Sequence, residues 1–271
     1  TDMINEQKNG NDLTKVAHEL VAPKKGILAA DESVKTMGKR LETIGVVSTQ
    51  ENRSRWREIM VETSGIEEAV SGVILFDETL REPLPNGKMI ADLLKSKNIY
   101  PCIKVDKGVV KFNEQEETFT QGLDKLEERL LEYKNMGATF AKWRAVYKVG
   151  EKMPSTVAVT SNSIGLAQYA LLCQRVGLVP IVEPEILVLE GSHDINKSKE
   201  VTTVVLKDVF YWLKQFGVKL NGMLLKPNMV LPGKESQNKS TAEEIARLTV
   251  ETLKATVPPE VPGIVFLSGG L

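Results

Sequence analysis

Charged side chains stand at the ends of several apolar runs, where their chemistry would be unusual. Lys226 ends the run from Gly222 to Lys226, which is typical of a buried strand. Burying an ammonium charge is costly, and a lysine that gives up its proton instead becomes a nucleophile. Lys226 could therefore form a Schiff base with a carbonyl substrate. The alternative is that Lys226 lies just past the strand and points into solvent, as most lysines do.

Six other ionisable residues also stand at or near the ends of such runs. They are Asp31, Lys104, Lys142, Arg144, Glu183 and Glu185. Residues two apart in a strand share a face, so Lys142 lies on the same face as Arg144, and Glu183 on the same face as Glu185. Contact with water explains one polar strand end easily. It explains poorly why three lysines, three carboxylates and an arginine should meet at one mouth.

This convergence predicts a particular chemistry. Ammonium groups held close together repel, which would lower the pKa of Lys226 and favour its nucleophilic form. Glu183 and Glu185 could share protons while a carbinolamine forms and dehydrates. Asp31 could accept the proton of a substrate hydroxyl when a carbon–carbon bond breaks. The tripeptide Ser268-Gly269-Gly270 offers backbone N–H groups to a phosphate, although such a sequence is more often only a turn.

Seven short apolar runs must supply the strands that position these groups. They span residues 26–31, 72–77, 102–106, 140–144, 179–185, 222–226 and 263–268. Each run is too short for an ordinary helix, and its continuous aliphatic character is typical of a strand covered on both faces. Helical patterns between the runs stop at Gly137, Gly177 and Gly217, and Ser240 to Glu243 reads as a capping box.

The alternation predicts one α/β domain over residues 1–271, a (β/α)₈ TIM barrel whose active site lies at the C-terminal ends of its strands. The glycine-rich fingerprint of a dinucleotide-binding fold is absent. Seven candidate strands leave a barrel one strand short. We therefore expect the eighth strand and a C-terminal tail to be absent from this chain, and residues 1–271 alone to be poorly folded and nearly inactive.

Composition excludes several classes of protein. The chain is 42% hydrophobic and 26% charged with a net charge of -1, which does not indicate a nucleic-acid or membrane-surface partner. No run approaches the ~20 apolar residues of a membrane helix, and the N-terminus does not resemble a signal peptide. The two cysteines read as buried free thiols in the cytoplasm. The two histidines, His18 and His193, lack the spacing of a zinc site, so no metal is expected.

Taken as strings in order, these runs resemble class I fructose-bisphosphate aldolase, the Schiff-base glycolytic enzyme. The matching segments are Gly26 to Ser33, Gly72 to Phe76, Ile103 to Val110, Phe140 to Arg144, Val179 to Leu187, Leu224 to Val230 and Phe266 to Gly270. The resemblance implies a cytoplasmic homotetramer that needs no cofactor and reversibly cleaves fructose 1,6-bisphosphate to dihydroxyacetone phosphate and glyceraldehyde 3-phosphate.

The resemblance also implies residue roles. Lys226 would carry the Schiff base, with Glu183 as the main proton shuttle and Glu185 assisting. Asp31 would act on the C4 hydroxyl, Lys142 would assist at the breaking bond, and Lys104 would bind substrate near it. The remaining substrate contacts would come from Ser33, Thr36, Arg40, Arg144, Ser268, Gly269 and Gly270.

Two departures and two alternatives accompany this interpretation. Residues 34–36 read Val-Lys-Thr where many relatives carry Thr-Gly and a small hydroxyl residue, so Thr36 keeps a hydroxyl for the C6 phosphate while Lys35 adds a charge. The family's eighth strand, with its phosphate-binding arginine, and its tyrosine-bearing tail have no counterpart.

One alternative function is a non-catalytic scaffold that binds actin or acidic peptides through Lys39, Arg40, Lys107 and Lys111. The other keeps the Schiff base but changes the substrate to another sugar phosphate.

Overall fold

A parallel sheet brings together segments that lie far apart in the chain. The computed structural model describes residues 12–267 of the protein. The strands of the main sheet are β1 (Gly26–Ala30), β2 (Val70–Leu75), β3 (Tyr100–Lys104), β6 (Phe140–Tyr147), β7 (Val179–Ile186) and β8 (Leu224–Leu225). They are hydrogen-bonded in the order β1-β2-β3-β6-β7-β8, and every pairing is parallel.

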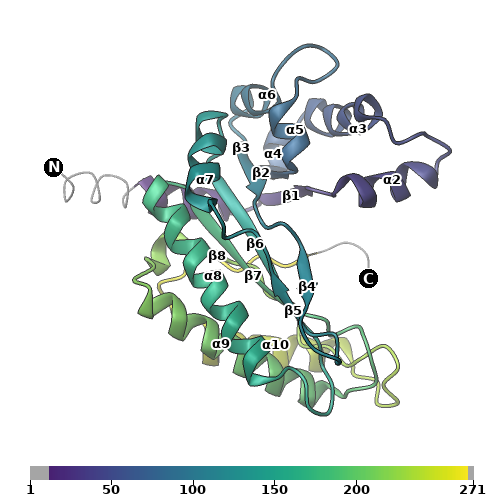
Figure 1. The fold of residues 1–271 in the computed structure, drawn as a ribbon, viewed down its shortest axis with the longest axis vertical. Coiled ribbons are helices and arrows are strands. Elements are labelled where there is room, and N and C mark those ends of the chain that lie inside the picture. The colour runs from purple at the N-terminus through teal and green to yellow at the C-terminus, as the bar shows by residue number, and fades with distance from the viewer. Residues whose placement is uncertain (1–11, 268–271) are drawn as a thin grey trace.

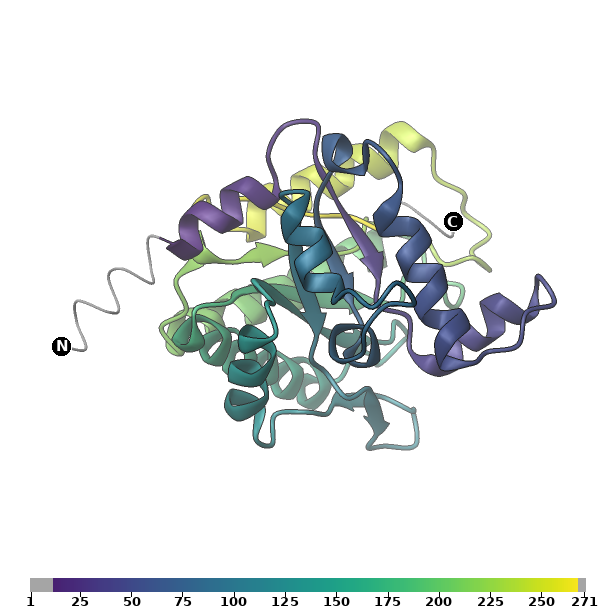
Figure 2. The ribbon, with the colours of Figure 1, turned by 90° about the horizontal axis from the view of Figure 1, so that it is seen from above.

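Helices connect these strands and cover the outside of the sheet. They are a helix over residues 12–20, α2 (Val34–Glu42), α3 (Gln50–Glu62), α4 (Ile66–Ala69), α5 (Asp77–Arg81), α6 (Ile90–Ser96), α7 (Leu126–Asn135), α8 (Thr156–Val176), α9 (Ile195–Gln215), the short 3₁₀ helix η1 (Leu220–Gly222) and α10 (Ala242–Thr256). Helices α8, α9 and α10 lie together along the long strands β6 and β7 (Figure 1). Seen from above, the sheet is curled, with helices around its outside (Figure 2).

The predicted α/β barrel class is confirmed as a curled parallel sheet. The run over residues 263–268 pairs less than predicted: Ile264 makes one parallel bridge to Leu225, and the Val265 N–H donates to the Leu225 carbonyl at 2.9 Å. Within residues 12–267, no further strand joins the main sheet. One edge of the curled sheet is therefore β1, and the other is the segment beside Leu225.

The inner face of the sheet holds an apolar cluster, which we call the barrel cluster. Its strand residues are Ile74, Cys102, Phe140, Val179, Ile181 and Leu224, and Leu13, Ala17 and Leu20 join it from the helix over residues 12–20. The Ser71 hydroxyl donates to the Leu20 carbonyl at 2.6 Å. This helix therefore covers the N-terminal end of the barrel interior, which leaves the opposite end, where the charged residues stand, for chemistry.

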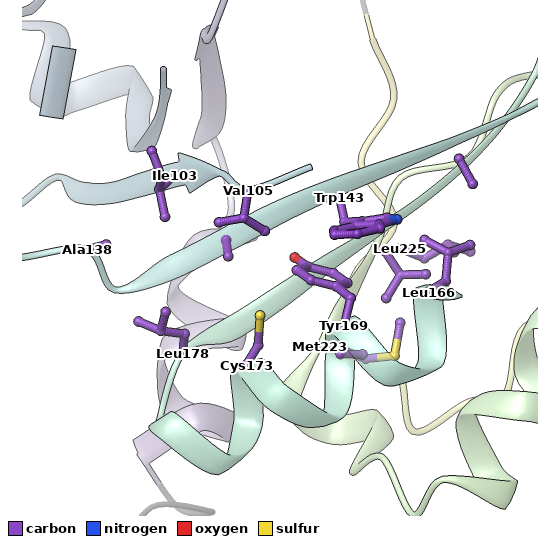
Figure 3. Close-up of a cluster of buried hydrophobic side chains, with 14 of the residues drawn as sticks. Ile103, Val105, Ala138, Trp143, Leu166, Tyr169, Cys173, Leu178, Met223 and Leu225 are labelled. Atoms are coloured by element: carbon purple, nitrogen blue, oxygen red, sulfur yellow. The ribbon is translucent and has the colours of Figure 1, made fainter. Parts of the chain in front are cut away.

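The outer face of the sheet packs against the helices through a second, larger cluster. Trp143 of β6 stacks on Tyr169 of α8 with ring centroids 5.5 Å apart, and the Tyr169 hydroxyl donates to the Ile181 carbonyl at 3.1 Å. Figure 3 shows both rings, with Cys173 and Met223, in the layer between α8 and the strands. Strand residues therefore alternate between two apolar environments, which explains the continuous hydrophobic runs.

Several element boundaries differ from the predicted ones. The run over residues 72–77 ends as a strand at Leu75, and Asp77 begins α5. The capping box is shifted by one residue: Thr241, not Ser240, is the N-cap of α10 and accepts from the Glu244 N–H at 3.2 Å. An antiparallel hairpin of β4 (Val109–Lys111) and β5 (Thr118–Thr120) was not predicted.

Other sequence expectations concern solvent exposure. Both cysteines are buried and free, as predicted. Of the helices in the described part of the chain, none is long and apolar enough to cross a membrane.

Candidate active site at the mouth of the barrel

Lys226 follows β8 directly and is not a solvent-facing lysine. Its backbone N–H still donates across the sheet to the Val182 carbonyl at 2.8 Å, which fixes the start of its side chain. The side chain is 11% exposed, and Nζ lies 2.8 Å from Oε1 of Glu183, which is 7% exposed. The amine and the carboxylate therefore form a buried pair, and a buried charge requires such a partner.

Lys142 links this pair to Asp31. Its Nζ lies 2.5 Å from Oδ2 of Asp31 and 3.5 Å from Oε2 of Glu183. Burial lowers the pKa of Lys142, but the charges of Glu183 and Asp31 outweigh it and raise the pKa above its ordinary value. Lys142 therefore stays an ammonium group near neutral pH and cannot serve as the nucleophile.

The chain Lys226–Glu183–Lys142–Asp31, which we call the mouth cluster, joins residues of four strands. Contrary to the sequence prediction, Lys142 and Glu183 lie within β6 and β7, whereas Asp31 and Lys226 directly follow β1 and β8. Three members sit two residues after an interior residue of their own strand: Leu224 precedes Lys226, Ile181 precedes Glu183, and Phe140 precedes Lys142. A polar layer thus lies directly above the apolar barrel cluster, because alternate residues of a strand share a face. The intervening residues face the helices and fix the orientation of each strand.

Glu185 does not pair with Glu183 as the sequence suggested. It forms an ion pair with Arg144, through the Arg144 Nε. Burial lowers the pKa of Arg144, but the hydrogen bond to Glu185 and the charges of the nearby carboxylates together outweigh this and raise the pKa. The physical reason is register: Arg144 lies opposite Glu183 on the neighbouring strand, so its long side chain can reach the next carboxylate along β7. Glu185 is therefore placed beside the mouth cluster, held by an arginine.

Lys104 lies next to Lys142 in the sheet register. Its Nζ is 3.5 Å from Oδ1 of Asp106, which lies two residues beyond it. Lys104 therefore adds a further cation at the edge of the mouth cluster, with its side chain 21% exposed.

Ser33, Thr36 and Arg40 are brought together around α2. Ser33 is the N-cap of this helix; its hydroxyl accepts from the Thr36 N–H at 3.2 Å and lies 3.1 Å from the Thr36 hydroxyl. Arg40, one turn further on, forms an ion pair with Glu32. A helix N-terminus with two hydroxyl groups and a nearby guanidinium suits an anionic group. Ser268, Gly269 and Gly270 lie outside the described residues.

Two cavities meet at Lys226. The first, which we call the mouth cavity, has a volume of about 610 Å³ and lies between β1 and residues 265–267, with Arg40 and Lys226 both in its wall. The second, of about 300 Å³, is lined mainly by apolar residues of 186–190 and 227–231, with Glu183 and Glu185 at its edge. The mouth cavity could therefore hold an extended ligand between a cationic residue of α2 and the amine.

Sequence reasoning missed Arg57 of α3, which is 1% exposed. Its guanidinium contacts the segment around Asp31, including the carbonyl and the carboxylate of Glu32. Residue type alone gives no indication that a charged residue inside a helix is buried. The four-residue spacing of Arg53, Arg57 and Val61, which share the inward face of α3, is the one pattern that could have suggested it. Among residues 12–267, no group of three or more His, Cys, Asp or Glu side chains could hold a metal ion.

The fold and the mouth cluster define an α/β-barrel protein with a buried, carboxylate-paired lysine directly after strand β8. The sequence model of the family "Fructose-bisphosphate aldolase class-I" matches residues 12–271. The chain belongs to this family. It is accordingly a glycolytic aldolase, which reversibly cleaves fructose 1,6-bisphosphate to dihydroxyacetone phosphate and glyceraldehyde 3-phosphate.

Individual relatives agree with this assignment. The chain is 51% identical to "Fructose-bisphosphate aldolase 5, cytosolic" of Arabidopsis thaliana over 264 residues, which is 97% of this chain and 73% of the relative. It is 50% identical to human "Fructose-bisphosphate aldolase C", covering 98% of this chain and 72% of the relative. A solved fructose-bisphosphate aldolase from Plasmodium falciparum, in complex with TRAP and a small-molecule inhibitor, superposes with a TM-score of 0.94 at 47% identity, covering 97% of this chain and 76% of that one.

Proposed function

We propose that the mouth cluster divides the aldolase reaction between its two lysine–carboxylate pairs. Lys226 and Glu183 form and hydrolyse the Schiff base, and Asp31 with Lys142 breaks the carbon–carbon bond. The observation that carries this proposal is the continuous buried chain from Lys226 through Glu183 and Lys142 to Asp31, with contacts of 2.8, 3.5 and 2.5 Å.

Schiff-base formation requires protons to move at Lys226. Lys226 first gives one proton to Glu183, whose Oε1 lies 2.8 Å away, and the neutral amine then attacks the C2 ketone. A second proton moves from the nitrogen to the new C2 alkoxide, which becomes a hydroxyl. Glu183 then gives a proton to the C2 hydroxyl, which leaves as water, and an iminium forms. Glu185, held by Arg144 at the edge of the same cavity wall, assists these transfers. Lys142 stays charged beside Glu183 and limits the charge imbalance when that carboxylate takes up or releases a proton.

Cleavage then uses the other end of the cluster. Asp31 takes the proton from the C4 hydroxyl, the C3–C4 bond breaks, and its electron pair moves into the iminium to give an enamine. Glyceraldehyde 3-phosphate leaves as the aldehyde. The ammonium of Lys142, 2.5 Å from Asp31, stabilises negative charge that develops on the C4 oxygen. Protonation of the enamine at C3 and hydrolysis of the imine release dihydroxyacetone phosphate and restore Lys226.

Substrate phosphates are held at two places in this proposal. Ser33, Thr36 and Arg40 bind at the α2 side of the mouth cavity, Lys104 and Arg144 contribute cations near the breaking bond, and Ser268 with Gly269 and Gly270 binds the C1 phosphate. The wall that Arg40 and Lys226 share supports the first of these assignments.

Borohydride reduction with dihydroxyacetone phosphate tests the assignment of Lys226. Reduction of the imine should leave a stable three-carbon adduct on the wild-type protein, and Lys226→Met should prevent it. Lys142→Met is the matched control, because its ammonium is held by two carboxylates and does not attack; it should retain the adduct. Adducts of equal yield on wild type and Lys226→Met would contradict the assignment.

We further propose that this is a single catalytic domain of a cytoplasmic homotetramer. The main support for one domain is the continuity of the sheet from β1 to β8. The support for the location is the printed name of a cytosolic relative. Sedimentation equilibrium of the purified protein tests the tetramer: a mass near four chains is expected, and a monomer at micromolar concentration would contradict it.

A second function, as a scaffold, has one specific support. The P. falciparum aldolase was solved in complex with TRAP, so a relative of this fold binds a partner besides a small molecule. In this chain the candidate groove would use Lys39, Arg40, Lys107 and Lys111 to bind actin or an acidic peptide. Co-sedimentation with actin filaments should be weakened by inorganic phosphate and by Arg40→Glu. Binding that neither change affects would contradict this groove.

A further inference from the structure

Arg57 is buried beside Asp31 although it contributes nothing to the mouth cavity wall. It comes from α3, and its side chain is 1% exposed. Its Nε donates to the Ala30 carbonyl at 3.0 Å, and its Nη2 donates to the Glu32 carbonyl at 2.7 Å. Ala30 and Glu32 are the two residues on either side of Asp31. One rigid guanidinium thus holds both peptide carbonyls that flank the proposed base.

This contact matters because β1 ends before Asp31. The strand pairs with β2 and stops at Ala30, one residue before Asp31. Asp31 itself is therefore not fixed by a sheet ladder. The two hydrogen bonds from Arg57 replace the missing ladder, and they set the direction in which the Asp31 side chain leaves the backbone.

Electrostatics agree with this placement. Burial lowers the pKa of Arg57, and the carboxylates of Glu32, Glu78 and Asp31 act in the opposite direction. Glu32 is the nearest of these, with Oε2 3.8 Å from Nη2, and its other oxygen pairs with Arg40. The guanidinium charge is therefore balanced beside Asp31, without a direct ion pair that would occupy the Asp31 carboxylate. Asp31 keeps its own contact with Lys142.

We propose that Arg57 is the positioning residue of Asp31: by clamping the carbonyls of Ala30 and Glu32 it aims the Asp31 carboxylate at the substrate hydroxyl. The proposal rests on the proposed role of Asp31 in cleavage. It predicts that loss of Arg57 impairs bond breaking and spares Schiff-base formation, because Glu183 lies on β7 and Lys226 directly follows β8, and neither contacts Arg57.

Arg53 provides the matched control. It lies one turn earlier on α3 and is also buried, at 8% exposed. Its hydrogen bonds go elsewhere: Nε donates to Glu78 Oε2 at 2.9 Å, and Nη1 donates to the Ser48 carbonyl at 2.8 Å. Arg53→Met therefore removes a buried guanidinium from the same helix without touching the residues that flank Asp31.

The test compares Arg57→Met, Arg57→Lys and Arg53→Met in the full chain, after thermal unfolding has shown which variants are folded. Arg57→Met should lower kcat for fructose 1,6-bisphosphate by about 10- to 100-fold, the usual cost of a misplaced catalytic group. It should leave KM and the rate of borohydride trapping with dihydroxyacetone phosphate near wild type. The kcat of Arg57→Lys should lie between those of wild type and Arg57→Met, because its ammonium can hydrogen-bond to one of the two carbonyls but not to both. Should Arg57→Met not fold, Arg57→Lys against Arg53→Met decides the question.

The combined variant separates failure of this inference from failure of the proposed function. If Arg57 acts through Asp31, then adding Arg57→Met to Asp31→Asn should reduce kcat less than threefold further. Multiplicative losses, or equal losses of cleavage and trapping in Arg57→Met, would overturn the positioning role. Normal cleavage by Asp31→Asn alone would instead overturn the role of Asp31 itself.

Discussion

The two lysines of the mouth cluster show how surroundings set the role of one residue type. Lys142 contacts two carboxylates, and its raised pKa keeps it charged. Lys226 contacts one of the same carboxylates and ends in the wall of both cavities. In the proposed mechanism the residue that lines the cavities is accordingly the nucleophile, and the enclosed residue supplies a fixed positive charge.

Replacing Lys142 should cost stability as well as activity. Lys142→Met leaves Asp31 and Glu183 buried without their shared cation, which should lower the free energy of unfolding by about 3 kcal/mol. Urea denaturation at pH 7 measures this loss. Lys111→Met, which removes an exposed pair with Glu116, should leave the free energy of unfolding nearly unchanged. Equal effects of the two variants would contradict the buried charge balance described here.

At the scale of elements, Gly72 of β2 allows the close packing of side chains inside the barrel. A Cβ placed there would lie 2.6 Å from Phe140 Cζ and 2.9 Å from Leu20 Cδ2, both in the barrel cluster. Gly72→Ala should therefore destabilise the fold by about 1–3 kcal/mol through overpacking. Gly26→Ala, at a strand position where the nearest atom would be 4.0 Å away, is the control and should be nearly neutral. Thermal unfolding distinguishes them, and a stable Gly72→Ala protein would contradict the close packing.

A second element-scale prediction concerns Tyr100, which joins β3 to the helix over residues 12–20. Its hydroxyl donates to Glu19, and burial, with help from this carboxylate, raises its pKa to about 12 from 10.0. An acid whose pKa is higher in the folded state stabilises the fold below its unfolded pKa and loses that contribution as pH rises. Stability should therefore fall between pH 10 and about pH 12.

Tyr100→Phe should remove this part of the pH dependence. Urea unfolding at pH 9, 10 and 11 measures it, with Tyr211→Phe at an exposed position of α9 as the control. The difference in stability between wild type and Tyr100→Phe should shrink as pH rises through this range. A difference that stays constant from pH 9 to 11 would show that the Tyr100–Glu19 contact does not depend on the phenol proton.

Sequence patterns predicted most strands of this fold because their residues meet apolar surfaces on both faces. They did not fix the boundaries. The capping pattern fits both Ser240 with Glu243 and Thr241 with Glu244, and the packing of Leu248 and Leu253 selects the second register. The β4–β5 hairpin was missed because its strands have three residues each and are half-exposed or exposed.

The candidate site was predicted where residue type and strand period agree, as for Lys142 with Arg144. It was not predictable where a contact depends on which long side chains meet across strands. Glu185 pairs with Arg144 and not with Glu183, and Arg57 of helix α3 contacts the C-terminal end of β1. Such contacts depend on register and on helix rotation, neither of which the local sequence determines.

At the scale of the whole molecule, the curled sheet makes one cavity between its two edges. Arg40 from α2 and Lys226 after β8 share the wall of the mouth cavity although they are far apart in sequence. With Lys226 proposed as the nucleophile, Arg40 is the cation of this wall that can hold a phosphate. A phosphate at Arg40, in addition to the one proposed at Ser268, favours a sugar bisphosphate over a monophosphate, which is the alternative substrate considered from the sequence.

The preference for a bisphosphate should depend on Arg40. Arg40→Met should raise KM for fructose 1,6-bisphosphate about tenfold, since a charge-assisted contact with the second phosphate is worth about 1.5–3 kcal/mol. It should leave KM for fructose 1-phosphate nearly unchanged. Lys39→Met, on the same helix but outside the cavity wall, is the control. Steady-state kinetics with both substrates measures the effect, and equal losses for the two would place Arg40 elsewhere.

The division of labour between the two pairs is the central claim, and one trapping experiment tests it most directly. Wild type and Asp31→Asn are mixed with fructose 1,6-bisphosphate, reduced with borohydride, and the modified peptides are mapped by mass spectrometry. Wild type should carry mainly the three-carbon monophosphate adduct on Lys226, because cleavage follows imine formation. Asp31→Asn should accumulate the six-carbon bisphosphate adduct on the same lysine. A three-carbon adduct in both proteins in equal proportion, or an adduct on Lys142, would contradict the claim.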